Sequence, residues 1–129
     1  MNYKQLVEKA YEAMDFSYSP YSNFKVGAAL LTKSGKVYTG CNVEIASFGA
    51  TNCAERTAIF KAISEGEHDY KAIAVVSSSR DFTYPCGICR QVIVEFSKDI
   101  DIIVAKDYDY EVYKIEELLP KSFTQIDLK

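Results

Sequence analysis

Three of the four cysteines constrain this 129-residue chain more than any other feature of its sequence. Cys53 lies at the start of one predicted helix, and Cys86 and Cys89 lie at the start of another. Because a predicted strand separates the two helices, their N-termini should meet at the same edge of a sheet. A Cys-x-x-Cys pair with a third thiolate supplies three ligands of a tetrahedral zinc site and leaves the fourth position for water. The spacing therefore predicts a catalytic metal site.

The hydrophobic pattern predicts a single α/β domain over residues 1–129. Two β-prone runs joined by Lys33-Ser34-Gly35 are typical of an antiparallel hairpin, and the continuously apolar run 72–76 is typical of a strand covered on both faces. The predicted elements are a helix at 2–15, strands at 25–32 and 36–42, a helix from Thr51 or Asn52 to 65, a strand at 71–78, a helix at 87–97, strands at 101–105 and 111–115, and a short helix at 115–120. This order predicts a three-layer α/β/α sandwich with a mixed five-stranded sheet.

Charge and hydropathy exclude several classes of function. With 15 basic and 18 acidic side chains the net charge is −3, and no basic run of five or six residues occurs, so nucleic acid is not an expected partner. No stretch approaches 18 uncharged apolar residues, and the first 16 residues lack an apolar signal region, so no membrane partner or secretion is predicted. We expect a cytoplasmic protein whose reduced cysteines serve metal binding or catalysis.

Two charged residues next to Cys53 suit a catalytic metal site. Glu55 lies in the first turn of the predicted helix, where a carboxylate can reach a water molecule at the open metal position and act as a general acid and base. Three thiolates give a zinc site a net negative charge, which helix N-termini and a guanidinium group can offset. Arg56 and Arg90 each directly follow a residue of the predicted site, and we expect Arg56 to donate hydrogen bonds to the thiolates.

Each of these residues also has a simpler interpretation. Free cysteine is often a core residue, which is the interpretation we prefer for Cys41, alone on a predicted strand. The Cys-x-x-Cys pair by itself is compatible with a thioredoxin-like redox motif, although Cys53-Ala54-Glu55 is then unexplained. Glu55 by itself is compatible with a solvated carboxylate near a helix N-terminus. If Cys41 supplied a fourth thiolate, the site would be closed, and the chain would be a zinc-stabilised binding module without turnover.

Four segments together resemble the family of small, homotetrameric cytidine deaminases. The Cys-x-Glu and Pro-Cys-x-x-Cys segments match the three-cysteine signature of zinc deaminases. The segments are 18–29, Gly40-Cys41-Asn42-Val43-Glu44, Cys53-Ala54-Glu55-Arg56-Thr57-Ala58 and Pro85-Cys86-Gly87-Ile88-Cys89-Arg90-Gln91. The resemblance covers almost the whole chain and implies a cytidine deaminase-like α/β/α fold in a homotetramer with active sites at subunit interfaces.

The resemblance also implies an activity. This activity is the hydrolytic deamination of free cytidine and deoxycytidine to uridine and deoxyuridine, with release of ammonia, in pyrimidine salvage. One zinc ion per subunit would be bound by Cys53, Cys86 and Cys89, and Glu55 would carry a proton from the zinc-bound water to ring N3 and then to the departing ammonia. The implied substrate contacts are Asn42 and Glu44 to the ribose hydroxyls, Phe24 to the pyrimidine ring, the backbone around Ala54 to the base edge, and Phe123 to a neighbouring subunit's pocket.

Three positions differ from the usual family pattern, and a related substrate class stays open. Ile45 stands where asparagine is common, Phe48 where tyrosine is common, and Ile88 where a small residue is common. The nearest alternative is deamination of a modified cytosine nucleoside, such as an aminoacylated nucleoside antibiotic. The Asn42-Val43-Glu44 segment favours an unmodified ribose, and the absence of a basic stripe argues against polynucleotide substrates.

Overall fold

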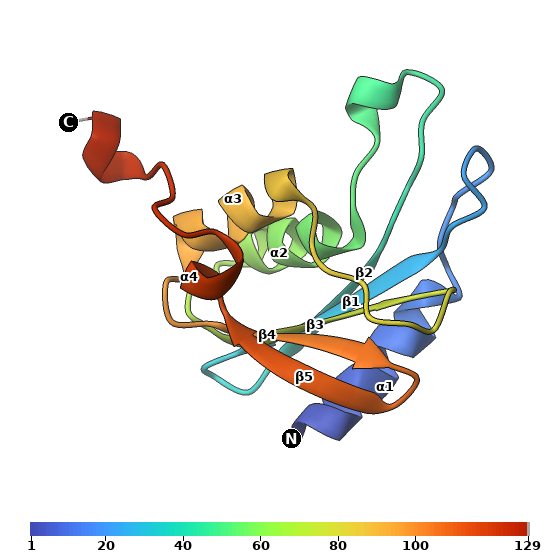
Figure 1. Ribbon diagram of the computed structural model, residues 1–129, viewed down its shortest axis with the longest axis horizontal. Coiled ribbons are helices and arrows are strands. Elements are labelled where there is room, and N and C mark those ends of the chain that lie inside the picture. The colour runs from blue at the N-terminus through green and yellow to red at the C-terminus, as the bar shows by residue number, and fades with distance from the viewer. Residues whose placement is uncertain (129) are drawn as a thin grey trace.

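Five strands form one mixed sheet in the order β2-β1-β3-β4-β5 in the computed structural model, which describes residues 1–128 (Figure 1). The strands β3 and β4 are parallel, and every other neighbouring pair is antiparallel. The continuously apolar strand β3 lies at the centre of the sheet, as predicted. The strands are β1 (Val26–Thr32), β2 (Val37–Cys41), β3 (Tyr70–Ser77), β4 (Asp101–Lys106) and β5 (Asp109–Lys114).

Helices cover both faces of this sheet (Figure 1). Because side chains alternate along a strand, neighbouring strand residues enter two different cores. One core packs against α1 (Tyr3–Met14), and the other packs against α2 (Ala54–Ser64), α3 (Gly87–Phe96) and the short α4 (Ile115–Leu118). The predicted three-layer α/β/α sandwich with a mixed five-stranded sheet is therefore confirmed.

The helix that carries Glu55 begins later than predicted. Its N-cap is Cys53, which has an extended backbone (φ −75°, ψ 157°), and not Thr51 or Asn52. The backbone of Asn52 is instead paired with Val43, with both N–H to O distances at 3.0 Å. A residue held in a β-bridge cannot adopt helical dihedral angles, so the helix starts only after Cys53.

The last strand, β5, also differs from the prediction. It starts at Asp109 rather than at residue 111, because its pairing with β4 continues to the turn.

Two segments project from the body of the molecule (Figure 1). The first, which we call the arm, comprises residues 44–52 and includes a short 3₁₀ helix (Phe48–Ala50). The second, the tail, comprises residues 119–128 and ends in another 3₁₀ helix (Gln125–Leu128). Both carry large apolar side chains that are exposed in a single chain, including Phe48 at 73% and Phe123 at 57% of their full accessible area. Such side chains are typical of surfaces that contact another molecule.

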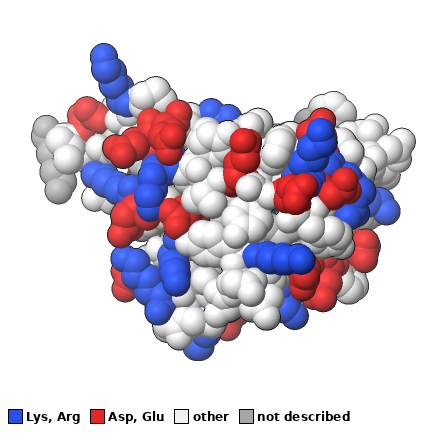
Figure 2. Space-filling view, turned by 60° about the horizontal axis from the view of Figure 1, so that its bottom comes forward, with Lys and Arg blue, Asp and Glu red and all other residues white. Residues whose placement is uncertain are grey.

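The surface shows no accumulation of one sign of charge over the face in Figure 2, where basic and acidic side chains are interspersed. Several of them form exposed ion pairs, such as Lys33 with Asp99 at 3.2 Å and Lys9 with Glu12 at 3.5 Å. Within residues 1–128, no helix combines the length and the apolar character needed to cross a membrane.

A close approach between β2 and α2 fixes the start of the helix that carries Glu55. Gly40 on β2 faces the first turns of α2, and a Cβ atom at this position would lie 2.5 Å from the carbonyl oxygen of Ala54 and 2.6 Å from the backbone nitrogen of Ala58. Both neighbours are backbone atoms, which cannot rotate away. Only glycine therefore allows α2 to pack this closely on the sheet.

We predict that Gly40→Ala displaces α2 and destabilises the protein by about 1–3 kcal/mol, the usual cost of overpacking. Thermal unfolding of the purified variant measures this effect. Gly49→Ala is the matched control, since a Cβ atom there meets no other atom within 4 Å. Equal melting temperatures for the two variants would contradict the proposed role of Gly40.

Candidate metal and catalytic site

The N-termini of α2 and α3 bring three thiol groups together. Cys53 is the N-cap of α2, Cys86 is the N-cap of α3, and neither side chain forms a capping hydrogen bond to its own helix. Cys89 follows in the first turn of α3 and is buried. The three Sγ atoms all lie within 4.8 Å of one another, and those of Cys53 and Cys86 are 3.7 Å apart. The predicted juxtaposition of Cys53, Cys86 and Cys89 is therefore present.

This cluster fits a zinc ion. Sulfur ligands at about 2.3 Å from a tetrahedrally coordinated zinc ion are about 3.8 Å from one another, which matches the separation of Cys53 and Cys86. Arg56 lies beside the cluster, and its Nη2 donates to Cys53 Sγ at 3.3 Å. Its Nε is buried and has no hydrogen-bond partner within residues 1–128. A guanidinium group in this position offsets the negative charge of three thiolates, as predicted for Arg56.

Hydrogen bonding and charge shift the pKa values of Cys53 and Cys89 in opposite directions. The hydrogen bond from Cys89, aided by Arg56, lowers the pKa of Cys53 to about 5. The same hydrogen bond, together with burial and the negative charge of Glu55, raises the pKa of Cys89. The Cys53 thiol therefore loses its proton more readily than the Cys89 thiol, and a thiolate is the form of cysteine that binds metal ions.

Glu55 is a buried carboxyl group next to the three thiols. Only 4% of its accessible area is exposed, so the alternative of a solvated carboxylate is wrong. Burial raises the pKa of Glu55 to about 7, and the negative charge of Cys53 acts in the same direction. A carboxyl group that gains and loses a proton near neutral pH is suited to general acid and base catalysis.

A cavity of about 310 Å³ opens beside the cluster. It is lined by residues from the start of β1, the end of β2, the arm, the first turn of α2 and the segment before α3. Predicted site residues among them are Phe24, Asn42, Glu44, Cys53, Ala54, Glu55 and Cys86. Seven of the predicted residues thus share one cavity, which is of the size that small-molecule sites have.

Asn42 and Glu44 are held rigidly at the wall of this cavity. The side-chain amide of Asn42 donates to Phe24 O at 2.8 Å and accepts from Val26 N at 2.9 Å. The Glu44 carboxylate accepts from the backbone nitrogens of Tyr21 and Ser22 and from the Ser22 hydroxyl. These hydrogen bonds, that of the Ser22 hydroxyl first, lower the pKa of Glu44 and keep it ionised.

The sequence analysis did not predict six of the residues that line the cavity, namely Ser22, Val26, Thr51, Asn52, Thr83 and Tyr84. Tyr84 directly precedes Pro85 and Cys86, so its position next to a predicted metal ligand was the available signal. Its ring packs edge-on against Tyr113 of β5, with ring centroids 5.8 Å apart. Because β5 is distant in sequence, no local pattern predicts this contact.

Phe123 lies outside the cavity of its own chain. It belongs to the projecting tail, and its backbone oxygen accepts a hydrogen bond from the Gln91 side chain of α3. Its predicted role in the pocket of a neighbouring subunit therefore stays a prediction.

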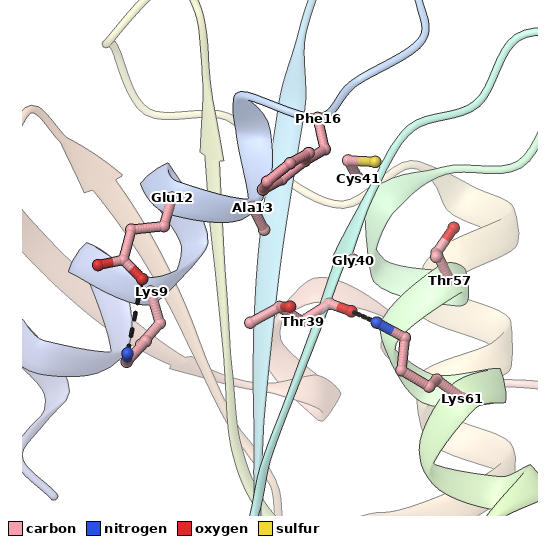
Figure 3. Close-up of a pocket in the computed structure, with 9 residues that line it drawn as sticks. All are labelled: Lys9, Glu12, Ala13, Phe16, Thr39, Gly40, Cys41, Thr57 and Lys61. Carbon is pink, nitrogen blue, oxygen red and sulfur yellow. Dashed lines mark hydrogen bonds and ion pairs between the residues drawn. The ribbon is translucent and has the colours of Figure 1, made fainter.

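Cys41 is separate from the thiol cluster and borders another cavity, of about 300 Å³, at the edge strand β2 (Figure 3). Lys61 lies in the same cavity and donates to Thr39 O (Figure 3). The thiol of Cys41 is half-buried, so the predicted core position is only partly correct, and burial raises its pKa. Cys41 does not supply a fourth thiolate, so the alternative of a closed, purely structural zinc site is wrong.

The fold and the site together define a zinc-dependent deaminase. A profile of the cytidine and deoxycytidylate deaminase zinc-binding region matches residues 1–106, and the chain belongs to this family of enzymes. It is 47% identical over 130 residues to a cytidine deaminase of Halalkalibacterium halodurans, covering 99% of this chain and 98% of that protein.

Two further proteins are informative comparisons. The crystal structure of a cytidine deaminase from Burkholderia pseudomallei superposes with a TM-score of 0.91 at 46% identity, covering 95% of this chain and 100% of that one. A blasticidin-S deaminase of Bacillus cereus is 31% identical over 129 residues, covering 94% of this chain and 91% of that protein.

We predict that Cys86→Ser lowers the zinc content of the purified protein clearly below one ion per chain, because a hydroxyl is a much poorer zinc ligand than a thiolate. Metal analysis of the desalted protein measures the content. Cys41→Ser is the matched control and should keep the zinc content of the unmodified protein. Loss of zinc in Cys41→Ser would contradict an open, three-thiolate site.

Proposed function

We propose that this chain hydrolyses free cytidine and deoxycytidine to uridine and deoxyuridine and releases ammonia. The observation that carries the proposal is the buried carboxyl of Glu55 beside a three-thiol cluster at the end of a cavity. A three-ligand zinc site has a free position for a reacting water, and a buried carboxyl group with a pKa of about 7 can move protons near it.

Glu55 performs the proton transfers of this reaction. A zinc ion held by Cys53, Cys86 and Cys89 would lower the pKa of a water molecule and so supply the nucleophile for C4 of the pyrimidine ring. The Glu55 carboxylate accepts a proton from that water and delivers it to ring N3. It then accepts the proton of the new C4 hydroxyl and gives it to the amino group, so that the C4–N bond breaks, a C4 carbonyl forms and ammonia leaves.

Neighbouring residues bind the nucleoside in this proposal. The Glu44 carboxylate is an acceptor for ribose hydroxyls, and Asn42 has a second amide hydrogen beyond the one donated to Phe24 O. Phe24, with 40% of its area exposed, offers its ring to the pyrimidine, and the buried backbone at Ala54 lies at the base edge. Preorganised groups of this kind bind their substrate with little loss of conformational freedom.

The charges around the cavity favour a neutral nucleoside. Among the described residues that line it, the charged side chains are the carboxyl groups Glu44 and Glu55, and none is Lys or Arg. A phosphate group would meet repulsion without a compensating cation. The interspersed surface charges and the net charge of −3 likewise lack the positive stripe that binds polynucleotides.

A modified cytosine nucleoside is the second candidate, supported by the similarity to a blasticidin-S deaminase. Relative rates with cytidine and with an aminoacylated cytosine nucleoside separate the two substrate classes.

We predict that the purified protein converts cytidine to uridine, seen as loss of cytidine absorbance with equimolar ammonia, and that a zinc chelator stops the reaction. Glu55→Gln should keep the fold and the zinc but lower kcat by about 10²–10⁴-fold, the usual contribution of a general acid and base. Turnover of the antibiotic nucleoside without turnover of cytidine would favour the second candidate. Near-normal turnover by Glu55→Gln would exclude the proton-transfer role.

We further propose that the enzyme is a homotetramer with active sites at subunit interfaces, in the cytoplasm, where it serves pyrimidine salvage. The exposed apolar side chains of the arm and the tail support the assembly, since they project from the body of a single chain. Phe123 would then cover the cavity of a neighbouring subunit and exclude water from it.

We predict that Phe123→Ala and Glu55→Gln complement each other when refolded together. Each variant alone has low activity, but a mixed oligomer contains sites with Glu55 from one chain and Phe123 from its neighbour. The activity of the mixture should therefore exceed the sum of the separate variants. A mixture of Glu55→Gln with Cys86→Ser is the control. There Glu55 and the thiol cluster of a site come from the same chain, so every site stays defective and no gain is expected.

A further inference from the structure

One wall of the catalytic cavity is formed by the connection between β3 and α3, residues 78–86. Thr83 and Tyr84 of this connection line the cavity. The Thr83 hydroxyl is hydrogen-bonded at 2.5 Å to the hydroxyl of Ser77, the last residue of β3. The Ser77 hydroxyl is also 2.8 Å from the hydroxyl of Ser79. At its beginning, Ser78 is paired through its backbone nitrogen with Lys25 O at 2.8 Å. At the outer bend of the connection, the backbone nitrogen of Arg80 donates to Ser77 O at 3.0 Å, and the side chain of Arg80 makes further contacts to other parts of the fold.

Arg80 attaches this bend to the turn between β4 and β5. Its Nε donates to Asp107 Oδ1 at 2.7 Å, and the backbone nitrogen of Asp107 donates back to Arg80 O at 2.8 Å. The guanidinium group lies over the ring of Tyr11, 4.3 Å from its centroid, and 5.5 Å from that of Tyr108. The Tyr11 hydroxyl, from α1, donates to Asp107 O at 2.8 Å. We call Tyr11, Arg80, Asp107 and Tyr108 the clasp.

The backbone of the clasp is held in an unfavourable conformation. Arg80 and Asp107 both have positive φ, at 59° and 51°, in the left-handed region that non-glycine residues seldom adopt. Such conformations persist where the surrounding contacts determine them, and they are concentrated at functional sites. None of the four clasp residues lines the catalytic cavity, so their effect on it must pass through the connection.

The same β4–β5 hairpin also contacts the connection next to the cavity. Tyr84 packs against Tyr113 of β5, and their hydroxyl oxygens are 3.5 Å apart. The Tyr113 hydroxyl donates to Glu111 at 3.1 Å. The hairpin thus holds the connection at two points, Arg80 at the turn and Tyr84 at the cavity.

From these contacts we propose that Arg80 is a positioning residue, which sets the place of Tyr84 in the cavity wall and thereby the fit of the substrate. The proposal rests on the proposed function. Cys53 and Glu55 are held independently of the clasp, because α2 is fixed by its packing on β2. Cys86 belongs to the connection, but it follows Pro85, whose backbone oxygen accepts from Arg90 Nε of α3 at 2.7 Å, and Arg90 also donates to Leu118 O at 2.6 Å. Loss of the clasp should therefore weaken substrate binding without changing the chemical step.

We predict that Arg80→Ala raises KM for cytidine about tenfold, as expected for a misplaced binding group, and changes kcat by less than about twofold. The zinc content should equal that of the unmodified protein. Arg80→Lys retains the charge but lacks the Nε donor and the planar guanidinium group. Its KM should therefore lie between that of the unmodified protein and that of Arg80→Ala. Lys36→Ala, which removes the ion pair between the exposed Lys36 and the partly buried Glu67 at the β1–β2 turn, is the matched control and should leave KM unchanged.

A double-mutant cycle with Tyr84→Ala tests the route of the effect. If Arg80 acts through Tyr84, adding Arg80→Ala to Tyr84→Ala raises KM no further. An equal rise in both backgrounds, an unchanged KM, or a loss of zinc in Arg80→Ala would each overturn the proposal. The proposed function fails separately, if the unmodified protein does not convert cytidine.

Discussion

The structure depends on the packing of two helix N-termini around three thiol groups. An N-cap residue usually has a hydroxyl, amide or carboxylate side chain that bonds to the first turn of its own helix. Here both N-caps are cysteines without such a bond, and their Sγ atoms are only 3.7 Å apart. The helices therefore lack side-chain capping hydrogen bonds at these ends. In return, the partial positive charges of the two helix N-termini and the charge of Arg56 stabilise the thiolates. The order helix, strand, helix and the glycine at position 40 follow from the need to bring these ends together.

Most of the fold and the reactive groups could be predicted from the sequence, because their signals are local. The uninterrupted apolar run of β3 and the spacing of Cys86 and Cys89 are examples. The start of α2 could not be placed correctly, because the backbone of Asn52 is held by Val43, and a cap preference carries no information about that bridge. Arg80 and Asp107 are 27 positions apart, and Tyr11 and Asp107 are 96 apart. Contacts at such separations depend on the finished fold.

Asn42 and Glu44 show how one short segment can hold neighbouring elements together and also present polar groups to a cavity. Asn42 joins the end of β2 to the start of β1, and Glu44 holds the backbone at Tyr21 and Ser22. The backbone that these side chains fix includes the position of Phe24, which faces the same cavity. The polar groups that we propose as ribose contacts are therefore already immobile without a substrate, and they would lose little further freedom on binding. Substituting either residue would alter the cavity wall as well as the proposed substrate contact.

The site divides the reaction between two parts of the chain. The chemical groups, Glu55 and the thiols, are on the first turns of α2 and α3, where helix packing fixes them. The cavity walls come from the start of β1, the arm and the connection before α3, and these are irregular segments attached by individual hydrogen bonds and aromatic contacts. Rigid elements suit the proton transfers, which need distances held to fractions of an ångström, whereas wall segments can change without disturbing them. Family members that act on different cytosine nucleosides are therefore expected to differ mainly in these wall segments. In this chain, Tyr84 is a wall residue whose position depends on a contact with a distant element, the ring of Tyr113 on β5.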